Sequence, residues 1–274
     1  MADVKLIGPV PQIGYGTWNR DGQVAYDCVR NALDIGYRYI DTAEGYNNEE
    51  FVGQAIVDSP VDRKDIFLTT KVAPESFAPG QIMGHVKTSL QKLQTPQVDL
   101  LLLHYPAIND EYDMEDYMAQ LAEVYDMGLA RHIGVSNFTI RHLNKAVELL
   151  GERKLTTNQC EIHPFMQNRP IVEHTLSKGI SMTAYSPLAR GDVLTSDLLI
   201  KIGETHGATP GQVALAFLMA EGFIVIPSAG SPERIAENFA AKDVVLSKDE
   251  IAQIREMDEG RRLVNGPWCP TWDE

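Results

Sequence analysis

Short apolar runs and longer amphipathic segments alternate along the chain. The short runs are rich in β-branched and other apolar residues, as strands are. Between them, apolar residues recur at helical spacing in segments such as 24–33, 80–93, 114–127 and 140–150. The alternation predicts either a (β/α)8 barrel or a doubly wound parallel sheet. The eight expected strands cover 12–15, 37–41, 66–71, 98–104, 132–136, 157–161, 181–185 and 223–227.

Two features favour the barrel over the doubly wound sheet. A dinucleotide-binding sheet carries the motif GxGxxG between its first strand and helix, but residues 14–19 read GYGTWN and lack the third glycine. Six expected strands each carry a polar residue at or near their carboxyl end, and in a barrel those ends meet at one mouth. We therefore expect a single α/β TIM-barrel domain over residues 1–274, with its active site at that mouth. The six residues are Asp41, Lys71, His104, Ser136, Gln159 and Tyr185.

The charge balance excludes several classes of partner. The 274 residues carry 24 Lys and Arg against 38 Asp and Glu, a net charge of −14 that repels phosphate backbones and anionic membranes. No apolar stretch approaches the roughly 20 residues needed to span a bilayer, and the first residues lack the pattern of a secretory signal. We expect a cytoplasmic protein with no nucleic-acid or membrane partner. Three widely spaced cysteines without a CxxC motif fit a reducing compartment: Cys28, Cys160 and Cys269.

The residues expected at the mouth suit acid–base chemistry. Lys71 ends an apolar strand, where a buried ammonium is costly unless a carboxylate pairs with it, and Asp41 ends the neighbouring strand. Tyr46 follows Asp41 closely, and a nearby lysine should lower the pKa of its phenol, which would make it a general acid near neutral pH. His104 is placed to hydrogen-bond the same substrate oxygen.

Each of these residues also has a simpler interpretation when it is taken alone. A strand-end Asp or His is commonly a turn or hydrogen-bonding residue, Tyr46 can be a packed aromatic, and Lys71 can form a Schiff base as in barrel aldolases. The joint placement on successive strands favours a catalytic role. No metal site is expected, because HxH spacing is absent around His132, His142, His163, His174 and His206.

Several ordered motifs give the chain a resemblance to a known family. Residues 36–43 read GYRYIDTA and are followed by Tyr46, Glu49 and the pair VG at 52–53, and residues 133–138 read IGVSNF. The segments GYGTW, SPL and RIAEN match in the same order, at 14–18, 186–188 and 234–238. From about residue 12 onward the chain resembles the aldo-keto reductases, and among them the bacterial 2,5-diketo-D-gluconate and methylglyoxal reductases. The resemblance implies a (β/α)8 barrel that acts as a monomer.

The resemblance implies a carbonyl reductase whose catalytic tetrad is Asp41, Tyr46, Lys71 and His104. In that tetrad Tyr46 donates a proton to the carbonyl oxygen, Lys71 held by Asp41 lowers the pKa of Tyr46, and His104 orients the substrate. Hydride passes from the nicotinamide to the carbonyl carbon, so that part of the chemistry belongs to the cofactor. Expected substrates are aldehydes and ketones such as methylglyoxal and 2,5-diketo-D-gluconate. The alternative is a nicotinamide-bound redox sensor on the same fold.

The resemblance also implies where the cofactor and the substrate bind. Ser136, Asn137 and Gln159 hold the nicotinamide carboxamide, and Tyr185 stacks on the nicotinamide ring. The substrate pocket is bordered by Trp18 together with Tyr46 and His104. Trp268 lies near the end of the chain, where it can close over this pocket or pack onto the barrel wall. The other expected cofactor contacts are Gly16, Thr17, Asp41, Ser186, Leu188, Ser228, Arg234, Glu237 and Asn238.

The adenosine end departs from the family pattern. Where the family reads Ile-Pro-Lys-Ser, residues 226–229 read IPSA, so the usual lysine is replaced by Ser228. Losing one charged contact to the 2′-phosphate costs about 1–3 kcal/mol, or roughly ten- to a hundredfold in affinity. Because Arg234 remains, we expect NADPH as the cofactor, with NADH possible and discrimination between the two weakened.

Overall fold

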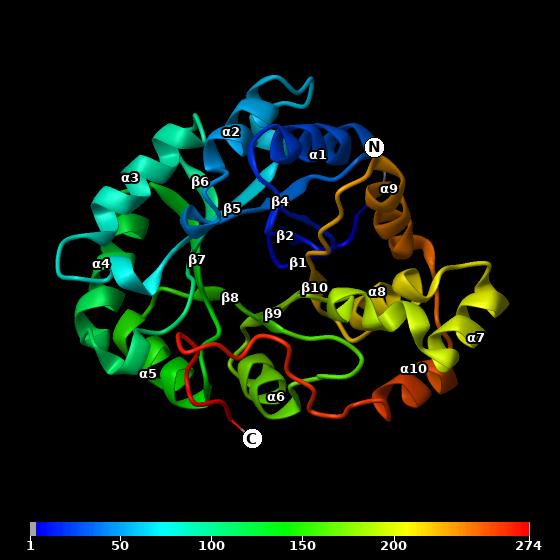
Figure 1. The fold of residues 1–274 in the computed structure, drawn as a ribbon. Coiled ribbons are helices and arrows are strands. Elements are labelled where there is room, and N and C mark those ends of the chain that lie inside the picture. The colour runs from blue at the N-terminus through cyan, green and yellow to red at the C-terminus, as the bar shows by residue number, and fades with distance from the viewer. Residues whose placement is uncertain (1–3, 274) are drawn as a thin grey trace.

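Eight parallel strands form a closed barrel with helices around its outside (Figure 1). The computed structural model describes residues 4–273. From β3 to β10 each strand pairs with the next strand in the chain, and a parallel bridge between Ile13 and Val225 closes the ring. The predicted barrel is therefore confirmed. Its strands are β3 (Tyr15–Gly16), β4 (Tyr39–Asp41), β5 (Phe67–Val72), β6 (Val98–Leu103), β7 (Ala130–Ser136), β8 (Leu155–Glu161), β9 (Ser181–Tyr185) and β10 (Ile224–Val225).

Amphipathic helices cover the outer surface of the barrel. Parallel strands covered in this way are buried on both faces, and β6 is buried at each of its 6 residues. Within residues 4–273, none of the helices has the length and apolar character needed to cross a bilayer. The helices are α1 (Gly22–Ile35), α2 (Glu49–Val57), α3 (Ile82–Lys92), α4 (Met114–Asp126), α5 (Ile140–Leu150), α6 (Arg169–Ser177), α7 (Asp197–His206), α8 (Pro210–Ala220), α9 (Pro232–Ala240) and α10 (Lys248–Arg255), and a hairpin of β1 (Leu6–Ile7) and β2 (Val10–Pro11) precedes the barrel.

The first barrel strand begins later than the sequence predicts. A strand is expected over 12–15, whereas β3 covers Tyr15–Gly16 and Ile13 makes only an isolated bridge. Glycine is needed at the preceding position, because a Cβ on Gly14 would lie 2.3 Å from the ring of Tyr39. The absence of a side chain at Gly14 therefore leaves room for the ring of Tyr39, which comes from β4.

The chain after α10 crosses the carboxyl end of the barrel. Glu259 and Arg261 donate their backbone N–H groups to the carbonyl oxygen of Phe165, at 3.1 and 3.0 Å. The carboxylate of Asp273 accepts a hydrogen bond of 2.6 Å from the backbone N–H of Ile140, at the start of α5. This stretch, orange-red to red in Figure 1, runs from α10 past α6 towards α5. We call residues 259–273 the C-terminal segment.

Candidate functional site

Four candidate residues meet at the carboxyl ends of neighbouring strands. Asp41 ends β4, Lys71 is the penultimate residue of β5, His104 directly follows β6, and Tyr46 lies in the turn after β4. The Lys71 ammonium donates hydrogen bonds to a carboxylate oxygen of Asp41, to the carbonyl oxygen of Thr42 at 2.7 Å and to the hydroxyl of Tyr46 at 3.3 Å. The structure thus brings Asp41, Lys71 and Tyr46 into direct contact.

Lys71 is fully buried, yet it keeps its charge because of its neighbours. Burial lowers the pKa of Lys71, but the negative charge of Asp41 and the hydrogen bonds to Asp41 and Tyr46 outweigh it, so that the pKa is raised overall. A buried ion pair persists when both partners are present and further hydrogen bonds satisfy them. The mouth therefore holds a permanent positive charge beside a phenol.

The expectation that Lys71 lowers the pKa of Tyr46 below its ordinary value is wrong. Burial has the largest influence and raises the pKa of Tyr46, Lys71 lowers it, and Asp41 raises it again. The pKa is raised overall because desolvation of the phenolate outweighs its attraction to the ammonium. Tyr46 therefore carries its proton at neutral pH, as a proton donor must.

His104 is uncharged at neutral pH. Burial lowers the pKa of its imidazole well below the ordinary value, and the positive charge of Lys71 lowers it further. The imidazole lies edge-on to the ring of Tyr46, with the two ring centroids 5.6 Å apart. A neutral imidazole has one N–H donor and one acceptor, so it can donate a hydrogen bond to a substrate oxygen.

The second carboxylate oxygen of Asp41 has two further donors. The side-chain amide of Gln159 donates to it at 2.8 Å, and the hydroxyl of Tyr39 donates to it at 3.1 Å. Gln159 comes from β8, four places from β4 in a ring of eight strands, so its hydrogen bond crosses the barrel interior. Sequence reasoning missed Tyr39. Strand alternation is the signal that could have found it, because residues 39 and 41 share one face of β4.

The residues expected around the nicotinamide lie together at the ends of β7, β8 and β9. The hydroxyl of Ser136 donates to the backbone carbonyl of Gln159 at 2.8 Å, and the amide of Asn137 donates to that of His104 at 3.0 Å. The hydroxyl of Tyr185 in turn donates to the side-chain oxygen of Asn137 at 2.9 Å. These bonds hold amide and hydroxyl groups in fixed positions beside His104.

Gly16 and Thr17 lie at the same mouth, at the end of β3. A Cβ on Gly16 would lie 2.8 Å from the carbonyl oxygen of Ile226, so this position favours glycine. Thr17 is fully buried, and its hydroxyl has no hydrogen-bond partner within residues 4–273. A buried hydroxyl without a partner is unfavourable and marks a place where a bound molecule can supply one.

Ser228 and Arg234 lie on either side of the turn that starts α9. The hydroxyl of Ser228 donates to the backbone carbonyl of Trp18 at 3.4 Å. Arg234 is exposed in the first turn of the helix and has Glu233 as its acidic neighbour in the chain. The helix N-terminus adds a partial positive charge at the same place. These groups form a surface on which an anionic group can be held.

The other residues expected along the adenine and the pyrophosphate are more enclosed. The carboxylate of Glu237 accepts a hydrogen bond of 2.9 Å from the hydroxyl of Thr209, and Asn238 is only 5% exposed. Ser186 and Leu188 follow β9, where Ser186 has a φ of +48°. That conformation is unfavourable for a residue with a Cβ, so the surrounding structure must maintain it.

The two tryptophans lie on different sides of the mouth. Trp18 is 53% exposed, and the guanidinium carbon of Arg190 lies 5.9 Å from its ring centroid. Trp268 is 45% exposed and adjoins Tyr105, the residue after His104. Burial raises the pKa of Tyr105, and the nearby Trp268 acts in the opposite direction. Trp268 therefore borders the His104 side of the mouth, whereas Trp18 borders the side of Ser228.

A buried carboxylate attaches the C-terminal segment to the barrel. Glu161, the last residue of β8, is 0% exposed and accepts hydrogen bonds from the backbone N–H groups of Leu263 at 2.7 Å and Val264 at 2.8 Å. The imidazole of His163 lies 3.0 Å from the same carboxylate. Burial raises the pKa of Glu161, but His163 and the two amides outweigh it, so that the pKa is lowered overall. Sequence reasoning also missed Glu161.

Glu161→Gln is expected to loosen the C-terminal segment and to lower the free energy of unfolding by about 1–3 kcal/mol. The new amide offers one acceptor oxygen in place of two, so one backbone N–H of Leu263 or Val264 loses its partner. Amide hydrogen exchange at these two residues should accelerate. Glu259→Gln, at an exposed residue of the same segment, is the control and should leave the exchange unchanged. Equal acceleration in both variants would argue against the attachment.

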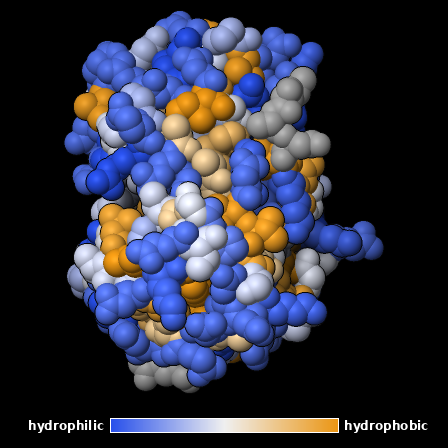
Figure 2. Space-filling model, turned by 90° about the vertical axis from the view of Figure 1, so that its right-hand side faces the viewer, coloured by the Kyte–Doolittle hydropathy of each residue, from blue (hydrophilic) through white to orange (hydrophobic). Residues whose placement is uncertain are grey.

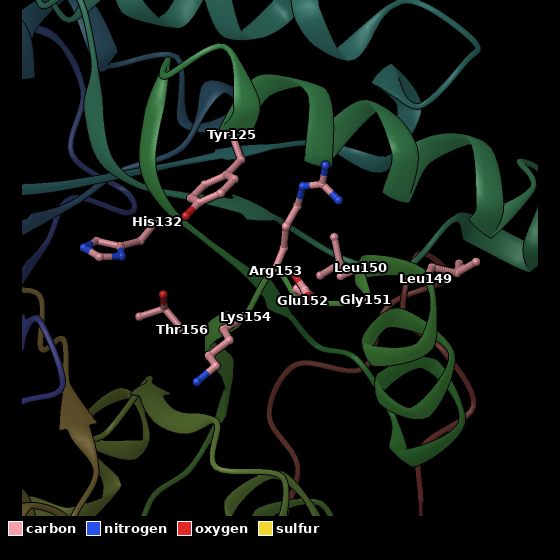
Figure 3. A pocket seen from close by; sticks show the side chains of 9 residues that line it. All are labelled: Tyr125, His132, Leu149, Leu150, Gly151, Glu152, Arg153, Lys154 and Thr156. Carbon is pink, nitrogen blue, oxygen red and sulfur yellow. The ribbon is translucent and has the colours of Figure 1, made fainter.

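A separate hollow opens at the other end of the barrel (Figure 3). It has a volume of about 670 Å³ and lies at the amino ends of β7 and β8, where His132 and Thr156 line it. Arg153 and Lys154 also line it, but in Figure 3 their side chains point in different directions, and Arg153 is paired with Asp126. The residues that line this hollow include none of the candidate site residues, so it is distinct from the mouth.

Comparison with known proteins identifies the family. The model of the "Aldo/keto reductase family" matches residues 12–259. Methylglyoxal reductase DkgB of Escherichia coli O157:H7 is 40% identical over 265 residues, which cover 96% of this chain and 99% of that protein. Methylglyoxal reductase DkgA of Escherichia coli strain K12 is 35% identical over 260 residues, which cover 94% of this chain and 93% of that protein.

Solved structures share the whole barrel. The crystal structure of a protein provisionally named 2,5-diketo-D-gluconic acid reductase B matches with a TM-score of 0.93 and 37% identity, over 97% of this chain and 94% of that chain. The aldose reductase of Schistosoma japonicum matches with a TM-score of 0.88 and 32% identity, over 93% and 91% of the two chains. The likeness thus extends along almost the entire length in both sequence and fold, and the chain belongs to the aldo/keto reductase family, whose members are oxidoreductases.

Proposed function

We propose that this protein uses NADPH to reduce small aldehydes and ketones, with Tyr46 as the proton donor. The observation that carries the proposal is the 3.3 Å contact between the Tyr46 hydroxyl and the fully buried ammonium of Lys71. The uncharged imidazole of His104 lies beside the same phenol. A proton, a fixed positive charge and a neutral hydrogen-bond donor are thus available at one point of the mouth.

The residues at the mouth fit a nicotinamide nucleotide. A carboxamide both donates and accepts hydrogen bonds, as do Asn137 and Gln159, and the buried hydroxyl of Thr17 is left without a partner within residues 4–273. Ser136, Asn137 and Gln159 would hold the carboxamide, and Tyr185 would pack against the ring. When bound, NADPH supplies the hydride for the carbonyl carbon.

The proton is moved by the protein's own residues. His104 donates a hydrogen bond to the carbonyl oxygen and orients it towards Tyr46. As negative charge develops on that oxygen, Tyr46 donates its phenolic proton, and the ammonium of Lys71 stabilises the resulting phenolate. Asp41 keeps Lys71 in place and charged. Because the pKa of Tyr46 is raised, the phenol stays protonated until such an oxygen is presented.

Methylglyoxal and 2,5-diketo-D-gluconate are the substrates that we propose. The relatives DkgA and DkgB are named methylglyoxal reductases, and one structural neighbour carries the name of a diketo-gluconic acid reductase. The test follows the loss of NADPH absorbance with each compound and with a nitrobenzaldehyde. Turnover supports the proposal. Tight NADPH binding without turnover of any carbonyl would favour the redox sensor, and absence of nucleotide binding would contradict both.

Ser228→Lys is expected to raise the preference for NADPH over NADH by about ten- to a hundredfold. The substitution adds a cation to the turn before Arg234, where we propose that the 2′-phosphate binds and where Arg20 already donates to the carbonyl oxygen of Ala229 at 3.3 Å. The measurement is the ratio of kcat/KM for the two nucleotides. Ser177→Lys, at an exposed serine of α6, adds the same charge elsewhere and should leave the ratio unchanged. An unchanged ratio in Ser228→Lys would place the 2′-phosphate away from this turn.

We also propose that the protein acts as a monomer in the cytoplasm. The face shown in Figure 2 is mostly hydrophilic, and its apolar side chains lie in separate patches. Permanent oligomers bury large, continuous apolar surfaces, so this face favours the monomer. Light scattering after size exclusion tests the proposal, with a mass of 30.4 kDa expected for the monomer.

A further inference from the structure

We propose that Tyr39 is a positioning residue for the proton transfer and that it acts through Asp41. The inference rests on the proposed function, in which Tyr46 donates the proton. Tyr39 is not a catalytic residue, because its hydroxyl faces the carboxylate of Asp41 and not the reacting groups. It lies one layer deeper in the barrel than Asp41. Its hydrogen bond sets how strongly the negative charge of Asp41 acts on Lys71 and Tyr46.

Tight packing fixes the position of the Tyr39 ring. The side chain is fully buried, and its ring fills the space at Gly14, where no Cβ fits. On another side it packs edge-on against the ring of Phe67, with centroids 5.5 Å apart. The hydroxyl of Thr69 donates to the Tyr39 oxygen at 3.4 Å, which leaves the Tyr39 proton for Asp41. Ring and hydroxyl are therefore both directed at the carboxylate.

Within residues 4–273, Tyr39 is one of three side-chain donors to the Asp41 carboxylate. One oxygen accepts from Lys71, and the other accepts from Gln159 and Tyr39. A hydrogen bond to a buried carboxylate stabilises its charge and reduces the field that it exerts on its neighbours. Removing the Tyr39 hydroxyl should therefore leave Asp41 with a stronger field.

The field of Asp41 acts directly on the proton donor. The negative charge of Asp41 raises the pKa of Tyr46, against the effect of Lys71. The other titratable groups that face Tyr46 are His104 and, further out, Tyr105. Neither of these contacts the Tyr39 hydroxyl, whose partners are Asp41 and Thr69. The hydrogen bond from Tyr39 weakens the field of Asp41 at Tyr46. The pKa of Tyr46 is therefore lower, and Tyr46 is a stronger acid, than it would be without that hydrogen bond.

Tyr39→Phe tests the inference because it removes the hydroxyl and keeps the ring. We expect the alkaline limb of kcat for carbonyl reduction to move to higher pH by about 0.5–1 unit, because the pKa of Tyr46 rises. At pH 7 kcat should fall about three- to tenfold, since a weaker acid transfers its proton more slowly. The profile is measured at saturating NADPH, and the KM for NADPH should not change.

Tyr37→Phe is the matched control. Tyr37 is also fully buried, and its hydroxyl donates to the backbone carbonyl of Ile235 at 3.3 Å, away from Asp41. This variant should reproduce the pH profile of the unaltered protein. A second test is Thr69→Val, which removes the donor to the Tyr39 oxygen and should move the limb in the same direction by a smaller amount.

The outcomes separate the inference from the proposed function. A folded Tyr39→Phe variant with an unmoved limb, or one moved to lower pH, overturns the inference. Equal shifts in Tyr39→Phe and Tyr37→Phe also overturn it, because they assign the effect to packing. Should Tyr39→Phe fail to fold, an unmoved limb in Thr69→Val overturns it instead. An unaltered protein that reduces no carbonyl contradicts the proposed function itself.

Discussion

Tyr46→Phe is expected to lower kcat for carbonyl reduction by about 10²–10⁴-fold and to leave NADPH binding nearly unchanged. The substitution removes the phenolic oxygen that lies 3.3 Å from the Lys71 ammonium, while the ring beside His104 remains. His104 cannot take over, because its lowered pKa leaves it as the neutral imidazole at neutral pH, and the remaining N–H is a far weaker acid than a phenol. NADPH consumption gives kcat, and a fluorescence titration gives the dissociation constant of the nucleotide.

Tyr105→Phe controls for the loss of a phenol at the same mouth. The centroid of its ring lies 5.3 Å from that of His104, and Trp268 lies close enough to lower its pKa. We expect kcat to fall by less than about tenfold in this variant, because the Tyr105 hydroxyl does not contact the reacting carbonyl oxygen. Retention of most of the activity in Tyr46→Phe would contradict the assignment of Tyr46 as the proton donor.

Asp41→Asn is expected to lower the free energy of unfolding by about 3–5 kcal/mol and to abolish most of the activity. The Lys71 side chain is fully buried, so the substitution leaves an ammonium in the interior without its counter-charge. Burial then acts on Lys71 with less opposition, and its pKa should fall. Denaturant unfolding of both proteins under the same conditions measures the loss.

The double variant Asp41→Asn/Lys71→Met separates the charge from the packing. It removes the unpaired ammonium as well, so most of the lost stability should return, although activity should not. The single variant Lys71→Met completes the double-mutant cycle. It leaves a buried carboxylate at Asp41 that still accepts hydrogen bonds from Gln159 and Tyr39. Equal stability of Asp41→Asn and the double variant would show that the ion pair is not the cause.

The barrel and its mouth could be predicted because their signals are local. Alternating strand and helix periods predict the architecture, and polar residues at strand ends predict the site, since those ends converge in any parallel barrel. The contact of Lys71 with Asp41 follows from the cost of an unpaired buried ammonium. These inferences need only the order of residues along each strand and the order of strands around the ring.

The parts that could not be predicted depend on contacts between distant segments. The raised pKa of Tyr46 results from desolvation of a half-buried phenol at the mouth, and strand-end position does not report desolvation. The Asp41–Gln159 hydrogen bond joins residues 118 positions apart in the chain. Glu161 likewise meets Leu263 from a segment with no helix or strand of its own. Strand alternation could have placed Tyr39 on the same face as Asp41, but it could not have predicted that the Tyr39 ring packs against Gly14.

The manner in which the C-terminal segment is attached makes it suitable for engineering. Glu161 binds the backbone N–H groups of Leu263 and Val264, and Phe165 accepts from the backbone of Glu259 and Arg261, so these bonds do not depend on the side chains of the C-terminal segment. Residues 265–272, which include Trp268, can therefore be randomised while the segment stays attached at 259–264. A library of this kind would vary one wall of the mouth without altering the barrel. Selection for activity on new carbonyl compounds would then start from a folded oxidoreductase.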